Sequence, residues 1–272
     1  MRTLTLVLSA MLVLSACDGG TTDETDTDPD TDTDTDSDTV PLVPVLEGTV
    51  KDADGNPVEG VSLFFCNYEI CYQQGTDANG AYSYIQARTG SYALKVHADD
   101  LPTATTALAA TEGQETRTLD IVLPDYQKSM PVPTSAGEYE LADGFYVTLS
   151  ASAISIPATS QDEVVGGTFV APGDRMPIDE MPPTGTVAGI WYLEAYDATP
   201  TGNDLPFRIA DVSGLGLADG DTVDIYVHSY KAFTENDQAT SQWVSAGSTT
   251  VSGTEVTGAL PYLSTVFLMK TN

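Results

Sequence analysis

Positive charge is scarce in this chain. Only 10 of its 272 residues are Lys or Arg, whereas 40 are Asp or Glu, so the formal net charge at neutral pH is −30. A nucleic-acid-binding surface needs clustered Lys and Arg to neutralise phosphates, which excludes DNA and RNA as partners. An anionic membrane surface is equally unfavourable for the folded part of the chain, so any membrane attachment must come from elsewhere.

Catalytic motifs are also lacking. The two histidines, His97 and His228, each follow a β-type run and cannot supply a His-Glu-x-x-His zinc site. No Gly-x-Ser-x-Gly nucleophile elbow is present. The abundant carboxylates leave a glycosidase pair open on spacing alone. We predict a protein that is not an enzyme, with no catalytic residues, no metal site and no cofactor.

The long hydrophobic run of a membrane span is missing. The apolar stretch from Leu4 to Leu14 is shorter than the roughly 20 residues that a spanning helix needs. Together with the preceding Arg2, this stretch indicates an export signal. It ends in Leu14-Ser15-Ala16-Cys17, which resembles the lipobox of bacterial lipoproteins. The resemblance implies a signal peptide over residues 1–16, cleavage before Cys17 and acylation of Cys17, with fatty acids such as palmitate as the membrane anchor. The alternative is an ordinary secretion signal with a chance cysteine.

Residues 17–40 contain the lipidated cysteine and an acidic stalk. The stretch from Asp18 to Thr39 repeats Thr and Asp, with no basic residue and no apolar side chain to form a core. Ordering a backbone costs roughly 1–2 kcal/mol per residue, so we expect this stalk to be disordered and extended. Calcium binding is the alternative, but the stalk lacks the glycine turns and fixed carbonyl ligands of a calcium loop.

The remainder predicts an all-β fold. Runs of helix formers are absent, and short alternating segments are separated by turn residues. Pro124, Pro131 and Pro133 mark a boundary, so we predict two tandem β-sandwich domains over residues 41–124 and 125–272. In the first domain, we expect strands at 46–50, 58–65, 81–85, 90–96 and 117–123.

Glycine, tyrosine and turn residues recur at defined spacings in the first domain. They are Gly48-x-Val50, Asp54-Gly55-x-Pro57-Val58-x-Gly60-Val61, Thr76-Asp77-x-x-Gly80-x-Tyr82 and Gly90-x-Tyr92. This order resembles the carboxypeptidase regulatory-like domain. The resemblance implies a transthyretin-like sandwich of seven strands and a module that accompanies catalytic domains without being one.

Two local patterns in this domain have competing interpretations. Cys66 and Cys71 predict a disulfide at a hairpin tip, because the chain is exported; zinc would need two further ligands nearby. The sequence Asp52-Ala53-Asp54-Gly55-Asn56-Pro57 predicts a turn. An EF-hand calcium loop would place its glycine after the third ligand and a glutamate at the twelfth position.

In the second domain, we expect strands at 144–149, 167–170, 189–193, 206–209, 222–227, 243–244 and 265–269. Trp191 and Trp243 are interpreted as core residues rather than ligand platforms. The segment Leu260–Met269 resembles the final strands of autoproteolysis-inducing sandwiches, whose active members carry His-Leu-Ser/Thr. Here Tyr262 stands in place of the histidine, with Ser264 retained. A tyrosine with a pKa of about 10 is a poor general base, so we predict no self-cleavage.

Function follows by elimination. We predict a lipid-anchored protein of the bacterial cell envelope, at the outer membrane or cell surface, which displays sandwiches for protein–protein interaction or structural support. The alternative is a carbohydrate-binding module, which would expose aromatics such as Tyr68, Tyr72 and Tyr82 as one platform. Tyr82 and Tyr84 lie two residues apart and therefore face the same side of a strand. We expect that side to be the core, which favours envelope proteins over polysaccharide as partners.

Overall fold

The computed structural model describes residues 45–67, 71–85, 89–110, 116–157, 164–228 and 243–271. In these residues β-strands are the main secondary structure, with one short 3₁₀ helix at Ser213–Leu215. The predicted signal peptide, the lipidation site Cys17 and the stalk lie outside these residues. Within the described ranges, no helix has the length and hydrophobicity to span a membrane.

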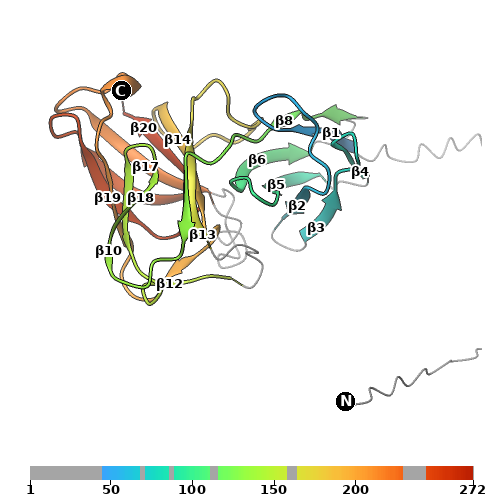
Figure 1. Ribbon diagram of the computed structural model, residues 1–272. Coiled ribbons are helices and arrows are strands. Elements are labelled where there is room, and N and C mark those ends of the chain that lie inside the picture. The colour runs from blue at the N-terminus through green and yellow to red at the C-terminus, as the bar shows by residue number, and fades with distance from the viewer. Residues whose placement is uncertain are drawn as a thin grey trace, which may run out of the picture. The chain divides into compact units, whose positions relative to one another are not determined.

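A first sandwich is built from two sheets (Figure 1). In one sheet, β1 (Val45–Lys51) pairs antiparallel with β4 (Ala81–Ile85) and parallel with the short strands β7 (Arg117–Thr118) and β8 (Ile121–Val122). The other sheet has the antiparallel order β3-β2-β5-β6, which comprises Cys71–Gly75, Ser62–Cys66, Gly90–His97 and Ala104–Ala110. Leu46, Leu63, Phe65 and Tyr84 are among the buried residues of the core of this sandwich.

The first sandwich differs from the sequence prediction at four strands. The strand expected at 58–65 begins only at Ser62. The single strand expected at 117–123 is divided into β7 and β8, and the Asp120 carboxylate between them bonds to Thr49 instead of continuing the ladder. Strand β3 was expected only as part of a hairpin tip. Strand β6 was not predicted, because its sequence Ala-Thr-Thr-Ala-Leu-Ala-Ala shows no polar alternation. Both faces of β6 are almost wholly buried, which removes that alternation.

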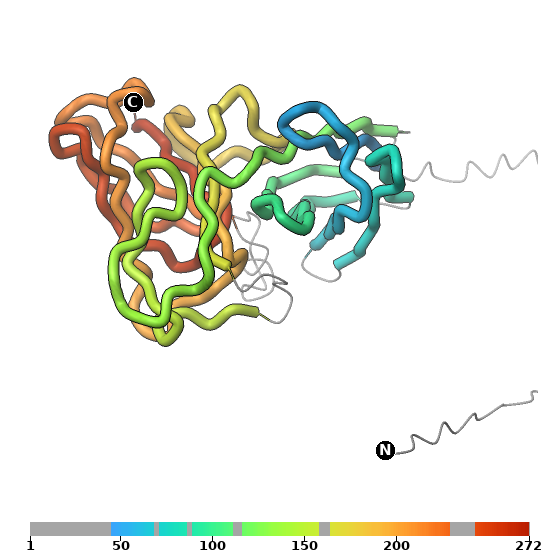
Figure 2. Tube along the Cα trace, viewed as in Figure 1, coloured from blue at the N-terminus to red at the C-terminus, as the bar shows by residue number. Residues whose placement is uncertain are grey.

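The second sandwich has a four-stranded and a six-stranded sheet. The first has the order β10-β11-β16-β19, which comprises Gly137–Ala142, Phe145–Leu149, Leu205–Ile209 and Val256–Leu260. The second has the order β18-β17-β20-β14-β13-β9, which comprises Trp243–Thr250, Thr222–His228, Thr265–Lys270, Thr186–Glu194, Val164–Val170 and Lys128–Pro131. Strands β12 (Ile154–Ser155) and β15 (Thr199–Pro200) form a small separate pair. Figure 2 shows the final strand, in red, running among earlier strands of the larger sheet.

Aromatic side chains fill the core between these two sheets. The Phe145 ring stacks on Phe207 with centroids 5.3 Å apart and lies 5.2 Å from the Trp191 ring. Trp191 and Trp243 are both buried, which confirms the prediction that they are core residues. Strands β9, β10, β12, β15 and β19 were not predicted, and Pro131, which was expected to mark the domain boundary, lies in β9.

The two sandwiches share a hydrophobic cluster. Residues 41–272 form one compact unit, and the cluster that contains Tyr92 and Leu108 of the first sandwich also contains Tyr192, Phe267 and Met269 of the second. The β6 strand therefore lies against the second sandwich instead of forming an open edge. We call this contact region the joint.

Candidate functional site

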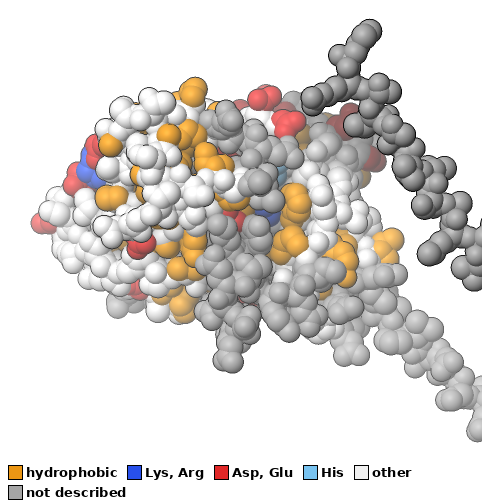
Figure 3. All heavy atoms as spheres, turned by 90° about the horizontal axis from the view of Figure 1, so that it is seen from below, with side chains coloured by type: hydrophobic (Ala, Val, Ile, Leu, Met, Phe, Trp, Pro, Cys, Tyr) orange, Lys and Arg blue, Asp and Glu red, His pale blue; other side chains and the backbone are white. Residues whose placement is uncertain are grey.

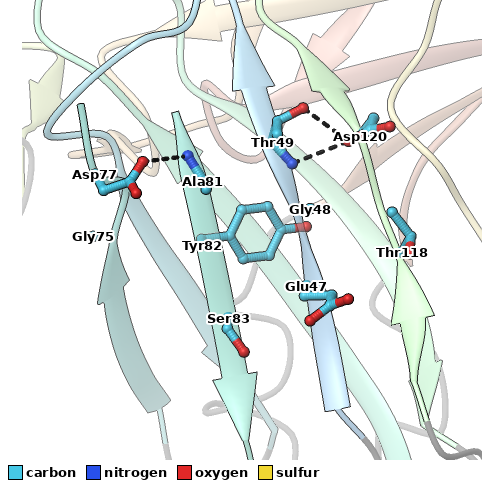
Figure 4. Close-up of a pocket in the computed structure, with 10 residues that line it drawn as sticks. All are labelled: Glu47, Gly48, Thr49, Gly75, Asp77, Ala81, Tyr82, Ser83, Thr118 and Asp120. Atoms are coloured by element: carbon cyan, nitrogen blue, oxygen red, sulfur yellow. Dashed lines mark hydrogen bonds between the residues drawn. The ribbon is translucent and has the colours of Figure 1, made fainter. Parts of the chain in front are cut away.

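A hollow of about 510 Å³ opens on the first sandwich, where β1, β4 and the β7–β8 segment lie side by side (Figure 4). Its lining combines three carboxylates with hydroxyl groups and small residues, and none of its lining residues is basic. The lining consists of Glu47, Gly48, Thr49, Gly75, Asp77, Ala81, Tyr82, Ser83, Thr118 and Asp120. We call this hollow the acidic pocket.

Two of the carboxylates are fixed by backbone amides. Asp77 Oδ1 accepts the amides of Asn79 and Ala81, and Asp120 Oδ1 accepts the Thr49 amide at 3.0 Å and its hydroxyl at 2.8 Å. The hydrogen bonds from Ala81 and Asn79 hold the pKa of Asp77 below its usual value, so this carboxylate is ionised at neutral pH. These bonds preorganise two negative charges at the rim of the pocket.

The floor of the acidic pocket depends on Gly48. The Tyr82 ring lies beside Gly48 (Figure 4), and its hydroxyl donates to the Leu119 carbonyl oxygen at 2.8 Å. A Cβ on residue 48 would lie 2.0 Å from that same oxygen. Glycine at this position therefore lets the β7–β8 segment cross close to β1, which brings Thr118 and Asp120 to the pocket.

The chemistry of the acidic pocket restricts its ligands. Carboxylates and hydroxyls without a basic partner repel anions and accept hydrogen bonds from ammonium, guanidinium or sugar hydroxyl groups. The face in Figure 3 agrees with this charge balance, since acidic side chains are more frequent on it than basic ones. The part of the chain that the structure describes contains no group of three His, Cys, Asp or Glu side chains arranged to hold a metal ion.

The aromatic side chains do not form a platform at this pocket. Tyr82 and Tyr84 are both buried, which confirms that they face the core. The Tyr72 ring is partly buried, with its centroid 5.3 Å from that of Tyr84, and Tyr68 lies outside the described residues. The large hydrophobic side chains described as exposed are Ile85, Val122 and Met181, and none of them is aromatic.

A second group of polar side chains is buried at the joint. Glu194, at the end of β14, accepts the Thr103 amide on Oε1 and the Tyr196 amide on Oε2, each at 2.6 Å. The Thr103 hydroxyl lies 2.8 Å from Nδ1 of His97. Burial raises the pKa of Glu194, while the bonds from Thr103 and Tyr196 and the nearby His97 act in the opposite direction.

Lys95 belongs to the same buried group. Its Nζ lies 4.3 Å from the Tyr196 ring centroid and 5.4 Å from that of Phe64. Burial lowers the pKa of Lys95, whereas the negative charges of Asp197 and Glu194 favour its charged form. The amine of Lys95, from the first sandwich, is thus buried near the carboxyl groups of Glu194 and Asp197, from the second. None of these three residues was predicted from the sequence to be functional.

The structure contains both the disulfide and the turn that were predicted for the first sandwich. Cys66 and Cys71 are joined by a disulfide, and they face each other across the β2–β3 hairpin as predicted. In the turn after β1, Asp52 uses one oxygen for the Asn56 amide and the other for the Asn56 side chain. This confirms a turn held by its own hydrogen bonds.

The histidines and Ser264 all lie in buried positions. His97 and His228 end strands β5 and β17, as expected, and both are buried. His97 belongs to the polar group of the joint, and the His228 carbonyl oxygen accepts the hydroxyls of Thr105 and Ser264. Cleavage before Ser264 remains a matter of prediction.

These sheets define an all-β protein made of sandwiches, and the first sandwich matches a known family. Residues 45–124 match the model of the carboxypeptidase regulatory-like domain family. The transthyretin-like arrangement of β1–β8 is consistent with that match, which confirms the resemblance that the sequence motifs indicated. No protein among the curated sequences matches the chain.

Several solved structures match parts of the chain at low similarity. A candidate carbohydrate-binding protein from Bacteroides uniformis is 8% identical, with 84% of this chain and 79% of that chain covered and a TM-score of 0.27. A DUF3823 family protein from Bacteroides ovatus is 14% identical, with 84% and 91% covered and a TM-score of 0.26. The dioxygenase domain of a dioxygenase and carbohydrate-binding protein fusion from Streptomyces is 19% identical, with 33% and 84% covered and a TM-score of 0.27. Because these identities and TM-scores are low, the fold is assigned from the strand order of this chain and not from these structures.

Proposed function

We propose that this chain is a non-catalytic, lipid-anchored protein of the bacterial cell envelope that holds another envelope protein through the acidic pocket. The observation that carries the proposal is the lining of that pocket, with three carboxylates and no basic side chain. Such a site complements a segment that presents Lys or Arg. The anchor at Cys17 would place the chain at the outer membrane or cell surface, and the acidic stalk would hold the sandwiches away from the lipid.

The test is site-specific photocrosslinking in intact cells. A photoreactive residue replaces Ser83 or Thr118 at the pocket, and Asn203, in an exposed turn of the second sandwich, is the control position. We expect Ser83 and Thr118 to give a discrete protein adduct that Asn203 does not give. The adduct should be lost when Glu47→Gln and Asp120→Asn remove the negative charges, because the partner is recognised by charge. Equal adducts from all three positions would contradict the proposal.

Membrane attachment is tested separately. Cys17→Ser should move the chain from the membrane fraction to the soluble fraction, because a lipid is the only proposed link to the membrane. Retention of this variant in the membrane fraction would overturn the anchor without affecting the pocket.

A second candidate function is the binding of a neutral polysaccharide. It is favoured by the hydroxyls of Thr49, Ser83 and Thr118 beside the carboxylates, since this combination can bond to sugar hydroxyls. Affinity electrophoresis of the full chain in gels that contain envelope polysaccharide distinguishes the two candidates. Retardation that Glu47→Gln and Asp120→Asn abolish, without a protein adduct at Ser83, would establish the sugar as the ligand.

A further inference from the structure

Lys95 carries a buried amine on the face of its sheet that the second sandwich covers. It lies in β5, and its direct neighbours on the adjoining strands are Phe64 and Thr105. Only 5% of Lys95 is exposed, and its Nζ lies 4.3 Å from the ring centroid of Tyr196. Lysine is almost never buried to this degree unless its amine has a partner, so the groups near this amine decide what it does.

Two carboxyl groups of the second sandwich lie near this amine. Glu194 and Asp197 are each 1% exposed, and their negative charges are the two that favour the charged form of Lys95. Asp197 acts more strongly than Glu194, which indicates that it is the nearer of the two, because the interaction of charges weakens with distance. The joint therefore gathers one amine and two carboxyl groups in a site that water does not reach.

The two carboxyl groups are held in different ways. Both oxygens of Glu194 are bonded to the backbone, one to the Thr103 amide and the other to the Tyr196 amide, each at 2.6 Å. Asp197 is fixed through its backbone, since its amide donates to the Leu263 carbonyl oxygen at 2.7 Å. Glu194 could reach the amine only by giving up two hydrogen bonds, so Asp197 is the carboxyl group better placed to meet it.

Burial makes these groups reactive toward each other. In water, a lysine is an ammonium ion and a carboxyl group is ionised, so the two form an ion pair and not an amide. Burial lowers the pKa of Lys95 and raises the pKa of Glu194, which shifts both groups toward their neutral forms. A neutral amine has the lone pair that attacks a carboxyl carbon. Holding the reacting groups in one site also favours the reaction far beyond what is possible in solution.

We propose that Lys95 and Asp197 form an amide bond between their side chains, with Glu194 as the proton carrier, and that this bond joins the two sandwiches covalently. Glu194 gives its proton to one Asp197 oxygen, and Nζ of Lys95 attacks Cγ of Asp197. As the N–C bond forms, one Nζ proton passes through Glu194 to the same oxygen, the C–O bond breaks, and that oxygen leaves as water. Glu194 ends ionised, which is the state that its two backbone amides stabilise.

The bond forms once in each chain and consumes no oxidant or cofactor. It is therefore compatible with a protein that is not an enzyme, and this inference goes beyond the proposed function and depends on other residues.

Tandem mass spectrometry of a tryptic digest of the full chain tests the bond. Trypsin does not cut after an acylated lysine, so the linked chain should release residues 89–117 and 176–208 as a single species, lighter by one water than the two peptides together. Recovery of residues 89–95 and 96–117 as free peptides from the folded, unsubstituted protein, with no linked species, would overturn the proposal.

The chain contains a matched control at its surface. Lys128 Nζ lies 3.2 Å from Asp143 and 3.7 Å from Glu140, so it also has two carboxylates beside it, but the site is open to solvent. The hydrogen bond to Asp143 raises the pKa of Lys128, which keeps it an ammonium ion. We expect no amide at Lys128. A link there as abundant as the one at Lys95 would show that burial is not the cause.

Three variants assign the roles within the site. Lys95→Met and Asp197→Ala should each abolish the linked species and return residues 176–208 as a free peptide; a linked species that persists in either variant would overturn the assignment. Glu194→Gln keeps the size of the side chain but has no proton to give. Its linked fraction should rise at least about a hundredfold more slowly after synthesis, while circular dichroism shows a folded chain. An equally fast rise would overturn the role of Glu194.

Discussion

Gly48 offers a direct test of how closely the first sandwich is packed. A Cβ at this position would lie 2.0 Å from the Leu119 carbonyl oxygen and 2.6 Å from its carbon. Gly48→Ala therefore forces the backbone of residue 119 away from β1. That backbone cannot move alone, because the Leu119 amide bonds to the Glu47 carbonyl oxygen at 2.7 Å.

The expected loss of stability has two parts. Overpacking of a well-filled interior costs about 1–3 kcal/mol. Displacing Leu119 also breaks the bond that its carbonyl oxygen accepts from the Tyr82 hydroxyl, and a buried polar group left without its partner costs about 1–3 kcal/mol. We expect Gly48→Ala to lower the free energy of unfolding by about 2–6 kcal/mol.

Equilibrium unfolding in urea, followed by circular dichroism, measures this loss. Gly173→Ala is the matched control, because a Cβ there meets no atom within 4 Å; its effect should stay within about 0.5 kcal/mol. Tyr82→Phe isolates the hydrogen bond and should cost about 1 kcal/mol. If Gly48→Ala costs no more than Gly173→Ala, the close crossing of the β7–β8 segment over β1 is wrong.

Three further results are expected. Intact mass of detergent-extracted protein should equal residues 17–272 plus acyl chains on Cys17, less two hydrogens for the disulfide and one water for the proposed amide between Lys95 and Asp197; loss of the segment from Ser264 onward would show self-cleavage. Burial alone would raise the pKa of Asp179, but the bonds from Arg117 and the Ala109 amide hold this pKa below its ordinary value of 3.8. The ionised Asp179 therefore stabilises the fold at pH values above 3.8, and this stabilisation is lost as the pH falls through the lower pKa of the folded state. Urea unfolding at a series of acidic pH values should therefore show a shallower loss for Asp179→Asn than for the unsubstituted protein, and parallel losses would refute this. Millimolar calcium should leave the melting temperature unchanged, because Asp52 already bonds through both oxygens to its own turn; a clear rise would revive a calcium site.

The first sandwich could be predicted from its sequence largely because its turns carry local signals. The Asp54-Gly55 and Asn79-Gly80 pairs need residues that tolerate positive φ, and both glycines have it, at 85° and 70°. Strand β6 carries no such signal. Its two buried faces carry only Ala, Leu and Thr side chains, which show no periodic alternation of polar and apolar residues.

The joint could not be predicted, because its partners are far apart in the sequence. Glu194 bonds to an amide 91 residues earlier. The alternation Leu94-Lys95-Val96-His97 is typical of a strand with one face in solvent. Both polar residues are nevertheless buried, because a second sandwich covers that face.

Because of the order of the strands in the chain, the outward edge of β6 lacks its bonding partners for some time during synthesis. The backbone amides along this edge donate to the side chains of Asp179, Glu194 and Thr265. Thr265 lies on the final strand. About 155 residues separate Ala110 from Thr265, which at ribosomal speed corresponds to roughly 8–30 s. During synthesis, β6 is therefore complete well before Thr265 has emerged. A holding chaperone that binds uncharged extended segments would have its natural substrate in this interval.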